Sequence, residues 1–324
     1  MRSGLAVCAL ALISTALLAG CGGTRLLVTA TATTEHPQAS PAAASLSSTG
    51  VSATTRVATR IAPIVPVELY QPLAQYTVYV DRLLARLKPQ LRALRSAALA
   101  NKPSTAKRDW LTAHVTWLEI GQDDDAYGAF GELGEEIDGP ASGLEGTISN
   151  PRFTGFHEVE LDLWRKHDLS AAAAGAKRLV SLVGELNHST VAADLPTTAL
   201  ALDGWVLRCH EILEDALRDS LSQDDDYGSN SDLTSLAADV TATREMLIVL
   251  SPLLEARVPR IVTQGSRDLS AVDAAIQSAG GPLTTRNLAE LPLRQRQALD
   301  QATGAALEAL APVSELMQVS VPGS

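Results

Sequence analysis

One short stretch of this sequence combines residue types that could bind a metal ion. It runs from Gly155 to Trp164 and reads Gly-Phe-His-Glu-Val-Glu-Leu-Asp-Leu-Trp. If the stretch is helical, His157 and Glu160 share one face with two core-type residues, because positions i, i+3, i+4 and i+7 are neighbours on a helix. An unpaired buried carboxylate is costly, and a cation bound between these two side chains would remove that cost. The same spacing also fits an amphipathic helix with a polar rim.

The sequence lacks the motifs of several other functional classes. A zinc protease of the His-Glu-x-x-His type needs a histidine where the chain has Leu161, and the inverted His-x-x-Glu-His arrangement fails at the same residue. No Gly-x-Ser-x-Gly, phosphate loop or dinucleotide fingerprint occurs. Two acidic loops, at residues 123–125 and 224–226, have no glutamate at the twelfth position of an EF-hand. We therefore interpret both loops as solvated acidic turns.

A second group of acidic residues surrounds position 211. Glu211 and Glu214 are three residues apart, and His210 stands four residues before Glu214. Since arginines lie nearby, the sequence alone favours a solvated, ion-paired helix face. Two other histidines, His114 and His167, have no carboxylate at helical spacing, and we interpret them as structural or surface residues.

The N-terminal residues predict export and lipid attachment. Arg2, a short apolar run and the sequence Leu-Ala-Gly-Cys ending at Cys21 resemble a bacterial lipoprotein signal, with residues 1–20 as signal peptide and lipid on Cys21. Residues 21–66 are rich in Ala, Ser, Thr and Pro, which predicts a disordered tether, and residues 67–320 form the folded domain. We expect an extracytoplasmic protein that is lipid-anchored to the cell membrane, facing the periplasm or the outer side of the cytoplasmic membrane. An ordinary secretory signal is the alternative.

The folded region is predicted to be all-α. From Leu69 onward apolar residues recur at helical spacing, and no long segment alternates with period two. We expect roughly eight helices, including one over residues 73–99 that is kinked or interrupted at Pro89. The net charge of −11 disfavours contact with nucleic acid and favours cations.

Several motifs resemble one protein family in their order and separation. They are Trp110–Gly121, Ala126–Gly131 with Glu135–Gly139, Phe153–Glu160 with Leu163–Trp164, and Glu211–Asp215 with Asp226–Gly228. Together they resemble the imelysin-like family, and within it the EfeO/EfeM type of bacterial iron uptake components. The resemblance covers about residues 68–318. The Gly-x-His-x-x-Glu motif of residues 155–160 is the signature of that family.

The resemblance implies two four-helix bundles with a cleft between them and a metal site in the cleft. Carried over position by position, it implies metal binding by His157, Glu160, Asp138 and Glu214. Family members often have two glutamates just after the position of Trp117, whereas this chain has only Glu119 there. The resemblance therefore implies either a site with fewer carboxylates or one that uses Glu119 as a ligand in a shifted register. The implied metal is iron, as Fe3+ or Fe2+, and the mixed carboxylate and imidazole donors would also accept zinc or manganese.

The resemblance also implies a function without catalysis. We expect a component of an EfeUOB-type system that binds iron and delivers it to an iron permease of the membrane, alongside a Dyp-type haem peroxidase. A cupredoxin domain is not expected, because residues 22–66 lack a set of copper ligands. The alternatives are a metal-dependent peptidase of imelysin type, a lipoprotein that binds acidic polysaccharide through a metal, and a helical scaffold without a ligand.

Overall fold

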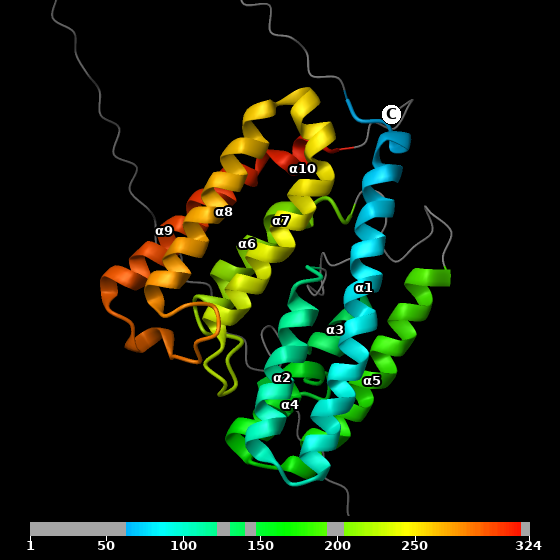
Figure 1. Ribbon diagram of the computed structural model, residues 1–324, viewed down its shortest axis with the longest axis vertical. Coiled ribbons are helices and arrows are strands. Elements are labelled where there is room, and N and C mark those ends of the chain that lie inside the picture. Colours follow the sequence, from blue (N-terminus) through cyan, green and yellow to red (C-terminus); the bar gives the residue numbers. More distant parts are fainter. Residues whose placement is uncertain (1–62, 122–129, 140–146, 193–203, 319–324) are drawn as a thin grey trace, which may run out of the picture. The chain divides into compact units, whose positions relative to one another are not determined.

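The computed structural model describes residues 63–121, 130–139, 147–192 and 204–318 (Figure 1). These residues lie in one compact unit, Ala58–Ser324. They form helices and loops without a strand, which confirms the all-α class. The predicted signal peptide, Cys21, the tether as far as residue 62 and the first acidic loop lie outside the described residues.

A first group of helices comes from the N-terminal half of the unit. It consists of α1 (Pro66–Leu99), α2 (Pro103–Leu118), α4 (Gly155–Leu161) and α5 (Leu169–Ala192), with the short α3 (Glu132–Asp138) packed on α4 and α5 and the 3-10 turn η1 (Thr147–Ser149) in between (Figure 1). The last turn of α4 continues as a π-helical turn, η2 (Asp162–Lys166). Helix α1 is not interrupted at Pro89, because Leu87 and Leu91 on either side of the proline are fully buried and hold the helix in the core.

A second group of helices comes from the C-terminal half. It consists of α6 (Arg208–Asp215), α7 (Asp232–Arg257), α8 (Pro259–Ala279), α9 (Leu293–Leu310) and α10 (Pro312–Leu316), with the 3-10 turn η4 (Leu288–Glu290) between α8 and α9. A π-helical turn, η3 (Ala216–Ser220), extends α6. Helix α7 contacts α6 and α8, and α9 contacts α6 and α8 (Figure 1).

The two groups share one continuous hydrophobic core. Helix α7 of the second group contacts α1 and α2 of the first. Trp205 stacks on Tyr76 with ring centroids 5.2 Å apart, and the fully buried Arg208 donates from Nε to the carbonyl oxygen of Gly121 at 3.3 Å. Within the described ranges, no helix has both the length and the apolar character that crossing a bilayer requires.

Candidate metal centre

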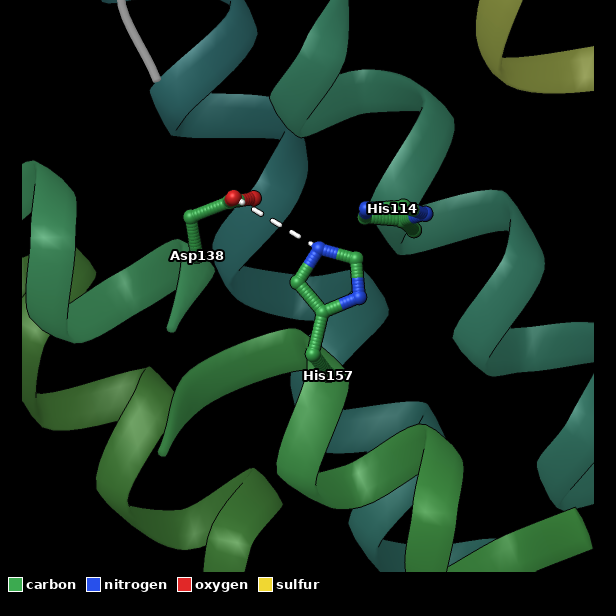
Figure 2. Close-up of side chains that lie close together, drawn as sticks. All are labelled: His114, Asp138 and His157. Carbon is green, nitrogen blue, oxygen red and sulfur yellow. Dashed lines mark ion pairs between the residues drawn. The ribbon is translucent and has the colours of Figure 1, made fainter. Parts of the chain in front are cut away.

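Three potential metal ligands meet inside the first group of helices. His114 comes from α2, Asp138 from the last position of α3 and His157 from α4. All three are buried, and one ligand atom of each lies within 4.8 Å of the others. Figure 2 shows the imidazole of His157 between the carboxylate of Asp138 and the ring of His114. Two imidazoles and a carboxylate form a donor set suited to a transition metal ion.

Two glycines bring Asp138 and His157 together. Gly139 ends α3 with φ of +69°, and Gly155 begins α4 with φ of +66°. A Cβ atom on Gly139 would stand 2.1 Å from the carbonyl oxygen of Thr154, and a Cβ on Gly155 would stand 2.2 Å from that of Ile137. The end of α3 and the start of α4 therefore touch backbone to backbone, which only glycine permits at both positions.

His157 lies between two carboxylates. Its Nε2 is 3.5 Å from Oδ2 of Asp138, and its Nδ1 is 3.5 Å from Oε2 of Glu160. Glu160 is 1% exposed, so the pair lies fully inside the core rather than at its edge. Contacts of 3.5 Å are longer than ordinary charge-assisted hydrogen bonds. The imidazole is thus held by charge more than by tight hydrogen bonds.

The carboxylates of Asp138 and Glu160 each accept hydrogen bonds from the surrounding protein through one oxygen, while the other oxygen faces His157. Trp117 donates its indole N–H to Oδ1 of Asp138 at 2.9 Å. The backbone N–H groups of Tyr227 and Ser229 donate to Oε1 of Glu160 at 3.0 and 2.9 Å. Such hydrogen bonds around a ligand fix its orientation before a metal arrives.

The positive charge of His157 and the negative charges of Asp138 and Glu160 stabilise one another. Burial acts to lower the pKa of His157, but Asp138 and Glu160 outweigh it and hold that pKa well above 6.5. Burial acts to raise the pKa values of Asp138 and Glu160, but the His157 charge and the hydrogen bonds to these carboxylates hold both values below their ordinary range. In the metal-free protein a proton on His157 therefore neutralises part of the carboxylate charge.

His114 is a ligand candidate that the sequence interpretation missed. Its side chain is buried, and neither ring nitrogen has a hydrogen-bond partner. Burial lowers its pKa to about 4, so the ring is neutral near pH 7. A neutral imidazole has a nitrogen lone pair that can bind a metal ion. The ring of Trp110 lies tilted against it with centroids 4.6 Å apart, and His157 meets it edge-on with centroids 5.4 Å apart. It was missed because its partners come from other elements than its own helix.

The centre opens into a small acidic cavity of about 60 Å³ between the two groups of helices. Among the described residues that line it are eight acidic side chains and one arginine, Arg208. The acidic residues are Asp138, Glu160, Asp215, Asp219, Asp225, Asp226, Asp232 and Asp239. Arg208 is already engaged, since its Nη1 lies 2.7 Å from Oδ2 of Asp215. The cavity therefore has a surplus of negative charge and favours a cation.

The second acidic loop is not the solvated turn that its sequence suggests. Asp224 is exposed, but the Oδ1 atom of Asp225 is shielded from solvent and has no hydrogen-bond partner. Burial raises the pKa of Asp225 to about 7, against the opposing effect of the His157 charge. Burial and the nearby Asp226 carboxylate likewise raise the pKa of Asp232 to about 7. The loop turns inward because its backbone is bound by Glu160.

Two further residues predicted as ligands lie outside this centre. Glu214 is exposed on α6, and Asp215, one position along, faces the cavity instead. Glu119 directly follows α2 and forms an ion pair with Arg86, beside a different hollow. On α2 the residue that lines the cavity one turn after His114 is Leu118, so a shift of one position turns the Glu119 carboxylate away.

Comparison with known proteins identifies similar chains. The iron uptake system component EfeO of Yersinia pseudotuberculosis is 24% identical over 217 residues, which cover 66% of this chain and 56% of EfeO. The iron uptake system component EfeM of Pseudomonas syringae is 21% identical over 208 residues, covering 64% of this chain and 70% of EfeM. This chain is similar to EfeO and EfeM.

A third relative extends the same result to another organism. EfeO of Escherichia coli K12 is 22% identical over 204 residues, which cover 63% of this chain and 52% of EfeO. The chain therefore spans about half the length of the EfeO proteins that it matches. No protein-family model matches the chain.

Proposed function

We propose that this protein is an EfeO/EfeM-like component of an iron uptake system that binds an iron ion through His114, Asp138, His157 and Glu160. The observation that supports this most strongly is the buried cluster of His114, Asp138 and His157, with ligand atoms within 4.8 Å of one another. The relatives named as iron uptake components support the choice of metal.

The donor chemistry is compatible with iron. Two imidazoles with carboxylate oxygens suit Fe(II), and each added carboxylate favours harder, more highly charged ions such as Fe(III). Zinc and manganese accept the same donors, so the donor set permits iron without excluding them. Because both carboxylates are oriented by Trp117 and by backbone N–H groups, the centre needs little rearrangement to receive an ion.

The wider assignment follows from the same proposal. The two groups of helices would be the two four-helix bundles of the imelysin-like architecture, with the acidic cavity as the cleft between them. The protein would act outside the cytoplasm, anchored through a lipid on Cys21, and deliver its ion to a membrane permease, with a haem peroxidase as a second partner. The iron would be cargo and would undergo no chemistry here.

A metal titration with a matched pair of histidine variants tests the proposal. His157→Asn removes a proposed ligand, whereas His167→Asn changes an exposed histidine at the end of η2, where asparagine tolerates the left-handed backbone. We expect the full chain and His167→Asn to bind one Fe2+ per chain under anaerobic conditions, and His157→Asn to bind at least about 100-fold more weakly. Quenching of tryptophan fluorescence reports binding, because Trp110 and Trp117 contact the centre.

Two results would count against this function. Equal binding by all three proteins would place any bound metal elsewhere, and absence of binding by the unaltered chain would remove the metal site altogether. A peptide-hydrolysis assay with the loaded protein distinguishes the peptidase alternative. Hydrolysis that disappears in His157→Asn and persists in His167→Asn would replace the transport assignment with an enzymatic one.

A further inference from the structure

The loop between η3 and α7, residues 221–231, is fastened to the metal centre from the opposite group of helices. Besides the two N–H groups bound by Glu160, the loop offers the carbonyl oxygen of Asp226 to Nη2 of Arg165 at 2.7 Å. Gly228 lies close against Trp164, where a Cβ atom would stand 2.9 Å from that of the tryptophan. The position of this loop is therefore set by η2 and by α4, the helix that also contains His157 and Glu160.

Within this loop, Asp225 has a carboxylate oxygen that lacks a hydrogen-bond donor. It lines the same cavity as His114, Asp138 and His157. Its Oδ1 atom is shielded from solvent without a donor, and its charge is close enough to help raise the pKa of His157. The nearby Arg218 does not supply the missing partner, because its guanidinium is shared between Asp215 and Asp219 at 3.0 and 2.7 Å.

We infer that Asp225 is an additional ligand of the ion bound by His114, Asp138, His157 and Glu160, and that it makes the centre selective for trivalent ions. This inference rests on the proposed function. A shielded carboxylate oxygen without a donor is costly, and coordination to an ion in the same cavity removes that cost. Coordination would also join the two groups of helices through the metal.

The charge of the ligands gives the selectivity. Two neutral imidazoles with Asp138 and Glu160 supply two negative charges, and Asp225 supplies a third, which balances Fe3+ and exceeds the charge of Fe2+, Zn2+ or Mn2+. An added hard oxygen donor also favours the harder ion. Asp225 is therefore expected to contribute more to the affinity for a trivalent than for a divalent ion.

A pair of neighbouring aspartates allows a matched test. Asp225→Asn and Asp224→Asn remove the same charge from adjacent positions, one turned into the cavity and one exposed. The probes are Ga3+, a trivalent ion that is not reduced, supplied as its nitrilotriacetate complex, and Zn2+. Calorimetric competition titrations of the full chain give both affinities. We expect Asp225→Asn to weaken Ga3+ binding by about tenfold or more and Zn2+ binding by less, and Asp224→Asn to leave both within about twofold.

The outcomes separate this inference from the proposed function. If the unaltered chain binds neither ion, the proposed function fails. If it binds them and Asp225→Asn behaves as Asp224→Asn does, only the role of Asp225 is overturned. Asp225→Glu keeps the carboxylate and should retain the preference for Ga3+. Loss of this preference in Asp225→Glu would also overturn the inference. Melting of the metal-free variants is a control, since Asp225→Asn removes a carboxyl group whose shielded Oδ1 has no donor and should not lower the melting temperature.

Discussion

In the proposed metal site, a proton and a metal ion would compete for His157. In the metal-free protein the imidazole lies 3.5 Å from Asp138 and from Glu160, whose charges hold its pKa well above 6.5. A metal ion can bind only the neutral ring, so binding must release that proton. The ion then replaces the positive charge that the proton supplied.

Metal affinity should therefore increase with pH. Between about pH 7 and the raised pKa of His157, each unit of pH should change the affinity for Zn2+ by about tenfold for the proton displaced from His157. Below pH 7 the change should be steeper if Asp225 also binds the ion, because its carboxyl must then lose a proton as well. Calorimetry in buffers of different ionisation enthalpy measures the number of protons released. An affinity that stays constant between pH 6 and pH 8, with no proton release, would contradict the protonated His157 described here.

The buried Asp232 should make the metal-free protein less stable as pH rises. Its pKa is about 7 in the folded protein and 3.8 as the ordinary value, so the folded state keeps the proton over a range in which the unfolded state loses it. The contribution of this group to stability is therefore lost between about pH 4 and pH 7.

Thermal melting with a chelator present checks this expectation. The difference in melting temperature between Asp232→Asn and the unaltered protein should increase by a few degrees from pH 4 to pH 7. Asp224→Asn, which changes the same residue type at an exposed position of the preceding loop, is the control. A flat difference for Asp232→Asn would mean that its carboxylate is not held in its protonated form by the fold.

Local spacing predicted some of these residues and could not predict others. The separation of His157 and Glu160 on one helical segment brought both to attention, and family motifs added Asp138. His114 and Asp225 have no partner within a few positions, because their neighbours in the cavity come from other helices. Residue types alone therefore made Asp225 look like part of a solvated turn, although one of its oxygens is buried.

At the scale of elements, the register of each helix decides which carboxylates reach the cavity. Helical periodicity predicted the all-α class and a helix that ends at Leu99, as α1 does. It did not predict that α1 continues through Pro89, since burial on both sides of the proline outweighs its local cost. It also could not place Glu214 and Glu119, because a shift of one position turns a side chain by about 100°.

The contact between α3 and α4 is the element-scale feature most exposed to mutation. Gly139→Ala would place a Cβ atom 2.1 Å from the carbonyl oxygen of Thr154 and move Asp138 away from His157. We expect a loss of more than about 2 kcal/mol in the free energy of unfolding, together with weaker metal binding. Denaturant unfolding and a Zn2+ titration measure the two effects.

Gly131→Ala distinguishes two causes of such a loss of stability, the strain of a positive φ and the clash between the two helices. Gly131 also has a positive φ, of +54°, but a Cβ atom there would meet nothing within 4 Å. Its ψ of −137° lies outside the left-handed helical region, so this variant should lose only the cost of the strained backbone, about 1–3 kcal/mol, and keep its metal affinity. If the two variants lose equal stability and bind Zn2+ equally well, the close approach of the two helices does not position the centre.

At the scale of the whole described unit, the centre depends on both groups of helices. The first group provides His114, Asp138, His157 and Glu160, and the second provides the acidic residues across the cavity. Contacts between residues far apart in the sequence, such as the ion pair of Arg257 with Glu68 at 3.1 Å, hold the two groups in this arrangement. The cavity exists only while the groups stay together.

The two hydrogen bonds from Tyr227 and Ser229 to Glu160 have a further consequence for how an ion would leave. The Glu160 carboxylate lies at the centre and also connects the two groups of helices. Moving the groups apart would therefore change the position of this carboxylate as well as the shape of the cavity. Thermodynamic reciprocity then requires that a protein which binds the separated arrangement weakens the hold on the ion, and that a loaded centre resists such a protein. A receiving partner could thus trigger unloading by docking alone, without touching the ion.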